Sequence, residues 1–118
     1  MGDTVLDPAG FARLLEITGD DLEFVDELVD TYLADAVVQL DAMRSAAADG
    51  DAAAMVRPAH SLKSSSENVG ATSLADACRS LEADGKAGVV PDAAERVAAC
   101  ESTFKAVEAA LLAERAGR

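Results

Sequence analysis

Apolar residues recur at three- and four-residue steps along most of the chain, the spacing of one face of an α-helix. The pattern predicts five helices, which span about residues 8–17, 21–48, 51–69, 73–83 and 91 to near the end. In the longest helix the apolar positions are Leu22, Val25, Leu28, Val29, Tyr32, Leu33, Ala36, Val37, Leu40 and Met43. Each helix thus has one face to bury against its neighbours.

Glycine, proline and capping residues set the boundaries of these segments. Gly70 follows the third segment at the C′ position that helix ends favour. Ser73 and Asp76 have the spacing of a capping box at the start of the fourth. Residues 84–88, which include two glycines, are predicted to form the one clear loop, and residues 114–118 are expected to fray.

Composition supports an all-α fold. Alanine, the best helix former, occurs 26 times, whereas aromatic residues make up only 3% of the 118 residues. Short connections between amphipathic helices make antiparallel neighbours. We therefore expect one domain over residues 1–118, an antiparallel up-down four-helix bundle with a short additional N-terminal helix across one end.

Charge narrows the range of partners. The chain has 22 acidic and 10 basic residues and a formal net charge of −12. Nucleic acids and anionic membranes bind basic surfaces, so neither is an expected partner.

No apolar run reaches the roughly 20 residues of a membrane helix, and the N-terminus lacks the features of a signal peptide. We expect a cytoplasmic protein.

The sequence contains no motif typical of a metal site, a nucleotide-binding loop or a hydrolase active site. A zinc site built from His60, Cys78, Cys100 and a carboxylate would lack the usual paired-ligand spacing, and buried free thiols explain the cysteines better. There is no glycine-rich phosphate loop. Ser65 and Ser66 have no second histidine as a base, so they are interpreted as small residues at a helix crossing. No cofactor is expected.

His60 is the remaining candidate for chemistry. Winding residues 51–69 as a helix places it on a polar face, with Arg57 one turn before it and Lys63 one turn after. A lone histidine on such a face can simply be solvated. Alternatively, its neutral imidazole can act as a nitrogen nucleophile, and the flanking cations would stabilise a dianionic group attached to it.

One run of residues around this histidine resembles the signature of histidine-containing phosphotransfer (HPt) domains; it reads Ala59-His60-Ser61-Leu62-Lys63-Ser64-Ser65-Ser66-Glu67-Asn68-Val69-Gly70-Ala71. The Leu-x-x-x-Cys-x-x-Leu-Glu of residues 74–82 also resembles the family. The resemblance implies a monomeric relay without an ATP site of its own. His60 would accept a phosphoryl group from the phospho-aspartate of a response-regulator receiver domain, including that of a hybrid histidine kinase, and pass it to another.

The resemblance also implies roles for neighbouring residues. Lys63 matches the family lysine that sits against the phosphoryl oxygens. Glu82 matches a position where some chemotaxis-kinase phosphotransfer domains place a carboxylate against the histidine ring, although an ordinary surface glutamate explains it equally well. Ser64 stands where the family usually has glycine, and Pro58 falls inside the helix, which predicts a bend. Because Ser64 departs from the family pattern, an alternative function stays possible: the protein would be a non-phosphorylated module that docks a receiver domain or kinase.

Overall fold

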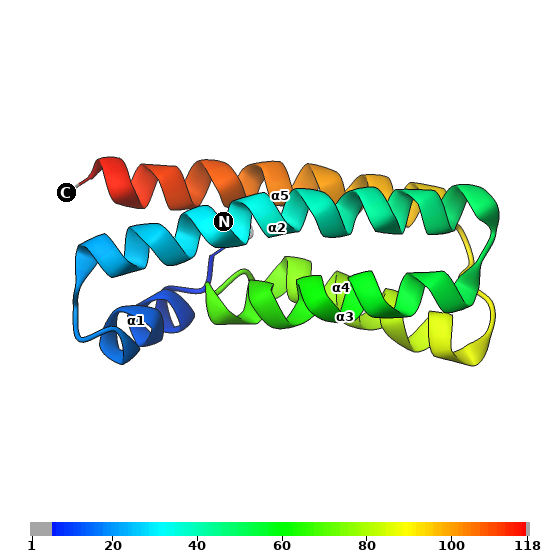
Figure 1. The fold of residues 1–118 in the computed structure, drawn as a ribbon, viewed down its shortest axis with the longest axis horizontal. Coiled ribbons are helices and arrows are strands. Elements are labelled where there is room, and N and C mark those ends of the chain that lie inside the picture. The colour runs from blue at the N-terminus through cyan, green and yellow to red at the C-terminus, as the bar shows by residue number, and fades with distance from the viewer. Residues whose placement is uncertain (1–5, 118) are drawn as a thin grey trace.

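Five helices account for most of the chain in the computed structural model, which describes residues 6–117. They are α1 (Pro8–Ile17), α2 (Leu22–Asp49), α3 (Ala52–Asn68), α4 (Thr72–Ala87) and α5 (Ala93–Ala116). The last four run up and down side by side, and α1 lies at one end (Figure 1). The described residues form no strand, so the predicted all-α bundle with a short N-terminal helix is confirmed.

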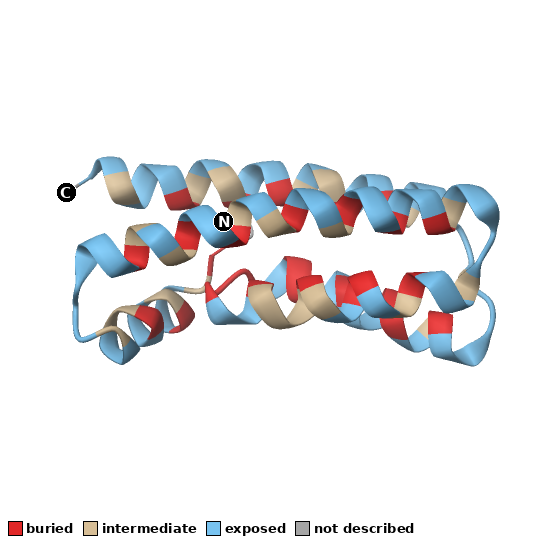
Figure 2. Ribbon diagram, viewed as in Figure 1, coloured by how far each residue is buried: buried red, intermediate tan, exposed pale blue. Residues whose placement is uncertain are grey.

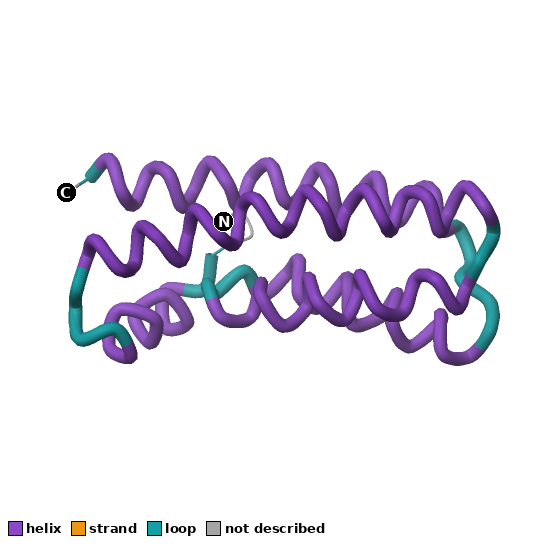
Figure 3. The backbone as a smooth tube through the Cα atoms, viewed as in Figure 1, coloured by secondary structure: helices purple, strands orange, loops and turns teal. Residues whose placement is uncertain are grey.

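Each long helix packs against two others, which closes the bundle. α3 contacts α2 and α4, and α5 contacts the same two from the opposite side. Short turns make these neighbours antiparallel (Figure 3). Within residues 6–117 no helix is long and apolar enough to cross a lipid bilayer.

Backbone contacts with Gly70 attach α1 to the end of α3. The Asp7 amide donates a hydrogen bond of 2.6 Å to the Gly70 carbonyl. A Cβ on Gly10 would lie only 2.8 Å from the Gly70 Cα, so the two backbones touch at a distance that only glycine permits. The short helix therefore covers the end of the bundle nearest the C-terminus of α3.

The core is built mainly from aliphatic side chains. The buried positions recur along the helices (Figure 2). On α2 the buried residues are Val25, Val29, Tyr32, Ala36, Leu40, Met43 and Ala46. The predicted stripe is wrong at Leu22 and Val37, which are 43% and 51% exposed. Leu22 stands at the first helical position, and Val37 is rotated about 100° from Ala36, which points inward.

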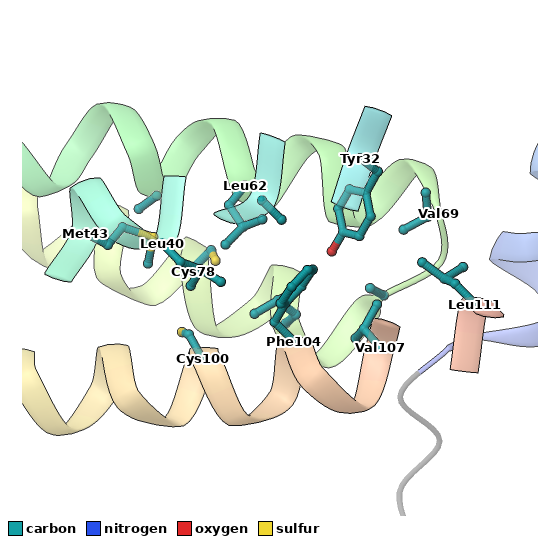
Figure 4. Packing of buried hydrophobic residues seen from close by; sticks show 14 of the residues in the cluster. Tyr32, Leu40, Met43, Leu62, Val69, Cys78, Cys100, Phe104, Val107 and Leu111 are labelled. Carbon is teal, nitrogen blue, oxygen red and sulfur yellow. The ribbon is translucent and has the colours of Figure 1, made fainter. Parts of the chain in front are cut away.

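Two aromatic rings lie within the core (Figure 4), and one of them also makes a polar contact. Tyr32 of α2 packs beside Phe104 of α5, with ring centroids 6.1 Å apart. The Tyr32 hydroxyl also forms a buried hydrogen bond of 2.8 Å with the Ser66 hydroxyl of α3. Burial raises the pKa of Tyr32 to about 12 although the bond to Ser66 opposes the rise, so the phenol stays protonated. Ser66 thus lies at a helix crossing, as predicted, and also forms a polar link there.

Cys78 and Cys100 are free and fully buried, as predicted. They face the interior from α4 and α5 (Figure 4). A hydrogen bond with Cys100 and burial raise the pKa of the Cys78 thiol, which keeps this thiol neutral.

The predicted loop at residues 84–88 is wrong, because α4 continues through most of it. Gly85 lies inside the helix and is buried against α3. A Cβ there would come within 2.8 Å of the Ala52 carbonyl oxygen and 2.9 Å of a Val56 methyl group. The helix stops only at Gly88, whose φ of 100° is left-handed. Gly85 therefore serves close helix packing rather than chain reversal.

The predicted capping box at the start of α4 is also wrong. Ala71 occupies the N-cap position, and no side chain caps the helix. Asp76 pairs instead with Arg79, one turn further along α4. The capping box fails because the helix begins at Thr72, which places Ser73 inside the first turn.

Of the residues predicted to fray, 114–116 are helical, because α5 continues to Ala116, and residue 118 lies outside the described residues. Arg115 forms ion pairs with Asp26 at 3.2 Å and Asp30 at 3.0 Å. These contacts with α2 hold the last turn in place.

Candidate functional site

Helix α3 carries His60 on its outer face. The Asp51 side chain caps the helix by accepting a 3.0 Å hydrogen bond from the Ala54 amide. The helix then runs through Pro58 as one element; the bend predicted there stays a prediction. Its buried residues are Met55, Pro58, Ala59, Leu62 and Ser66. With this face packed, His60 points to solvent, as the helical winding predicted.

The His60 ring is accessible on one side and anchored on the other. Its side chain is 56% exposed. Nδ1 lies 2.8 Å from Oε2 of Glu82 on α4. A carboxylate only accepts hydrogen bonds, so this contact places the proton on Nδ1 and leaves the lone pair on Nε2. Nε2 has no hydrogen-bond partner among residues 6–117, and the exposed side chain leaves the ring open to an approaching molecule.

Glu82 is the centre of a small charge network. The residue is only 6% exposed. Lys63 reaches Oε1 at 3.1 Å, and Lys86 reaches Oε2, also at 3.1 Å. Burial by itself would raise the pKa of Glu82, but the hydrogen bonds from Lys63, Lys86 and His60 outweigh it and lower the pKa to about 2. Glu82 is therefore a charged acceptor for Nδ1 at neutral pH.

The other residues singled out on α3 lie around this network. Lys63 is half-buried because it leans toward Glu82. Ser64 is partly exposed, and in the part of the chain that the structure describes its hydroxyl has no hydrogen-bond partner. Arg57 is exposed, and none of the described carboxylates pairs with it. The structure thus brings His60, Lys63 and Glu82 into contact and leaves Ser64 outside the bonded network.

Lys86 also belongs to this charge network, although the sequence pattern did not indicate it. It lies four residues after Glu82, a spacing that pairs side chains on a helix. The relation was hidden because the helix was predicted to end at residue 83, which left Lys86 in a loop. A prediction that carried α4 past Gly85 would have exposed the pair.

The described residues offer no cluster of three histidine, cysteine or acidic side chains suited to a metal ion. His60 is at the surface, whereas Cys78 and Cys100 lie in the core, so the zinc ligands considered from the sequence are not brought together. What the arrangement offers is an oriented, exposed imidazole nitrogen with ammonium groups close by.

Comparisons with known proteins identify the family of the chain. The chain is similar to the crystal structure of histidine-containing phosphotransfer protein B (HptB) from Pseudomonas aeruginosa PAO1, with 31% identity, a TM-score of 0.86 and coverage of 99% of each chain. A search of curated proteins found no significant match. The sequence model of the Hpt domain matches residues 27–114, which is more than half of the chain. The chain therefore belongs to the Hpt domain family and is a histidine phosphotransfer protein of a phosphorelay.

Proposed function

We propose that His60 is the phosphoryl acceptor, taking the group from the phospho-aspartate of a receiver domain and passing it to another receiver domain. The observation that carries this proposal is the 2.8 Å contact between Nδ1 and Glu82, which leaves Nε2 as the outward nucleophile. A hybrid histidine kinase that carries a receiver domain would be a donor of this kind. The protein acts as a monomeric cytoplasmic carrier with no ATP site of its own.

In the transfer step the Nε2 lone pair attacks phosphorus. The bond between phosphorus and the aspartate oxygen breaks as the phosphorus–nitrogen bond forms, and the donor aspartate leaves as a carboxylate. The proton stays on Nδ1, where the ionised Glu82 balances the positive charge that develops on the ring. The same geometry serves the reverse step, in which another aspartate accepts the group.

Lys63 supplies the charge that the phosphoryl oxygens require. It lies on α3 one turn after His60, and its ammonium group is already held near the ring by Glu82. A lysine ammonium is a mobile point charge, so it can turn from the carboxylate toward the arriving phosphoryl group. Lys86 remains on Glu82 when it does so.

The test is incubation of the protein with a phosphorylated receiver domain. We expect label on His60 that is labile in acid and stable in alkali, and no label from ATP alone. His60→Gln should lose all label and keep its fold, because an exposed helix residue contributes little to packing. If the protein binds receiver domains without gaining phosphate, it is a docking module rather than a carrier. Retained label in His60→Gln would mean that another residue is the acceptor.

A further inference from the structure

The positive charges of this acidic protein are mostly neutralised. Arg44, Arg79, Arg96 and Arg115 each form ion pairs with carboxylates, and Lys63 and Lys86 share Glu82. Three cationic side chains among residues 6–117 have no carboxylate partner; they are Arg13, Arg57 and Lys105. Within that described range these are the cations whose charge no ion pair compensates.

Arg57 differs from the other two in its position. It is exposed on α3, three residues before His60, which places it one turn away on the same side of the helix. Arg13 lies on α1 and Lys105 on α5. Around His60, Arg57, Lys63 and Lys86 outnumber the carboxylate of Glu82. Two further carboxylates on α3 and α4, Glu67 and Asp84, are neutralised by Arg79 and Arg96. The surface around His60, here called the cationic face, therefore has a net positive charge.

This local charge matters because the whole protein carries a net charge of −12. A phosphorylated aspartate is an anion, so most of such a surface repels it. A local patch of opposite sign directs an anionic partner to one face and raises its association rate. The planar guanidinium of Arg57 is also suited to bind a carboxylate with two parallel hydrogen bonds.

We propose that Arg57 is a docking contact for a carboxylate on the surface of the receiver domain, outside the reacting phosphoryl group. This inference rests on the proposed function, since the partner is the same receiver domain. Of the two cations expected to flank His60, Lys63 is the one that the ion pair with Glu82 holds in the network around the ring. Arg57 forms no ion pair within residues 6–117, so it contributes to encounter and orientation, and the stabilising charge for the chemistry at Nε2 comes from Lys63. Its removal therefore slows transfer between proteins and leaves the intrinsic reactivity of His60 unchanged.

The experiment compares Arg57→Gln and Arg57→Glu with the matched controls Arg13→Gln and Arg13→Glu. Both arginines are exposed and unpaired, so each substitution changes the net charge equally at a different place. Transfer is measured from a receiver domain that phosphorylates the parent protein, at about 20 mM and about 500 mM salt. A second arm uses phosphoramidate, a small phosphoryl donor that labels histidine without protein docking.

At low salt we expect transfer to slow about threefold in Arg57→Gln and about tenfold in Arg57→Glu, with most of the difference lost at high salt. The Arg13 variants should match the parent, as should labelling of every variant by phosphoramidate. Equal rates for the Arg57 and Arg13 variants would overturn the docking role. A loss of phosphoramidate labelling in the Arg57 variants would overturn it too, because the residue would then act on the histidine itself. Absence of any receiver-dependent label in the parent would instead count against the proposed function.

Discussion

Replacing Gly85 with alanine tests whether the close approach of α3 and α4 holds the site together. The added Cβ would lie 2.8 Å from the Ala52 carbonyl oxygen and 2.9 Å from a Val56 methyl group. The carbonyl is backbone, so it cannot move without moving α3 as well. Glu82 and Lys86 lie three residues before and one residue after Gly85 on α4. Separation of the two helices would therefore lengthen the contact between Glu82 and His60.

Two effects of opposite sign set the size of the change in stability. Overpacking a well-filled contact costs about 1–3 kcal/mol. Alanine in place of glycine inside a helix recovers about 1 kcal/mol. We therefore expect Gly85→Ala to lower the free energy of unfolding by about 1 kcal/mol, which corresponds to a decrease in Tm of about 4 °C for a domain of this size.

Two measurements test this expectation: the free energy of unfolding in urea and the ¹⁵N NMR signals of the His60 ring. Ala83→Gly, the reverse substitution at an exposed position two residues earlier in α4, measures the local cost of glycine, about 1 kcal/mol. In Gly85→Ala, ¹⁵N NMR of His60 should show a mixture of the two ring tautomers, because the hold of Glu82 on Nδ1 is weaker. If Gly85→Ala instead gains the stability that Ala83→Gly loses, and the ring is unchanged, the proposed tight contact does not exist.

Three further predictions concern the core, the charge network and the departure from the family signature. Tyr32→Phe leaves the buried Ser66 hydroxyl unpaired and should cost about 1 kcal/mol in urea unfolding, whereas the double variant with Ser66→Ala should cost less than the two single changes added together. The pKa of Glu82 is lowered in the folded state to about 2 from an ordinary 4.5, so its contribution to stability is complete above pH 4.5 and is lost as the pH falls toward 2. The stability difference between the parent and Glu82→Gln should accordingly shrink over that range, and a constant difference would contradict the network. Ser64→Gly should be less stable by a few tenths of a kcal/mol and accept phosphate at least as fast, because glycine opens the path to His60; a severalfold slower transfer would make the serine hydroxyl a phosphoryl ligand.

Local periodicity was enough to predict the helices and the direction in which His60 points. Both depend on winding a single helix, in which the buried residues Met55, Ala59 and Leu62 place His60 on the outside. The short turns between amphipathic segments were likewise enough for an antiparallel bundle. Apolar periodicity and turn residues involve only positions close together in the sequence, so these predictions need no knowledge of contacts between distant residues.

Tertiary structure alone decided the chemistry around the ring. The sequence explained Glu82 equally well as an ordinary surface glutamate or as a partner for His60. The choice between the two depends on how closely two helices approach. Gly85 allows that approach by packing against the α3 backbone, yet glycine in a sequence first indicates a break in a helix. Because α4 continues past Gly85, Lys86 lies on the helix, one turn from Glu82. A contact between helices is set by packing across residues distant in sequence, and for this reason the network of His60, Glu82 and the two lysines was visible only in the folded chain.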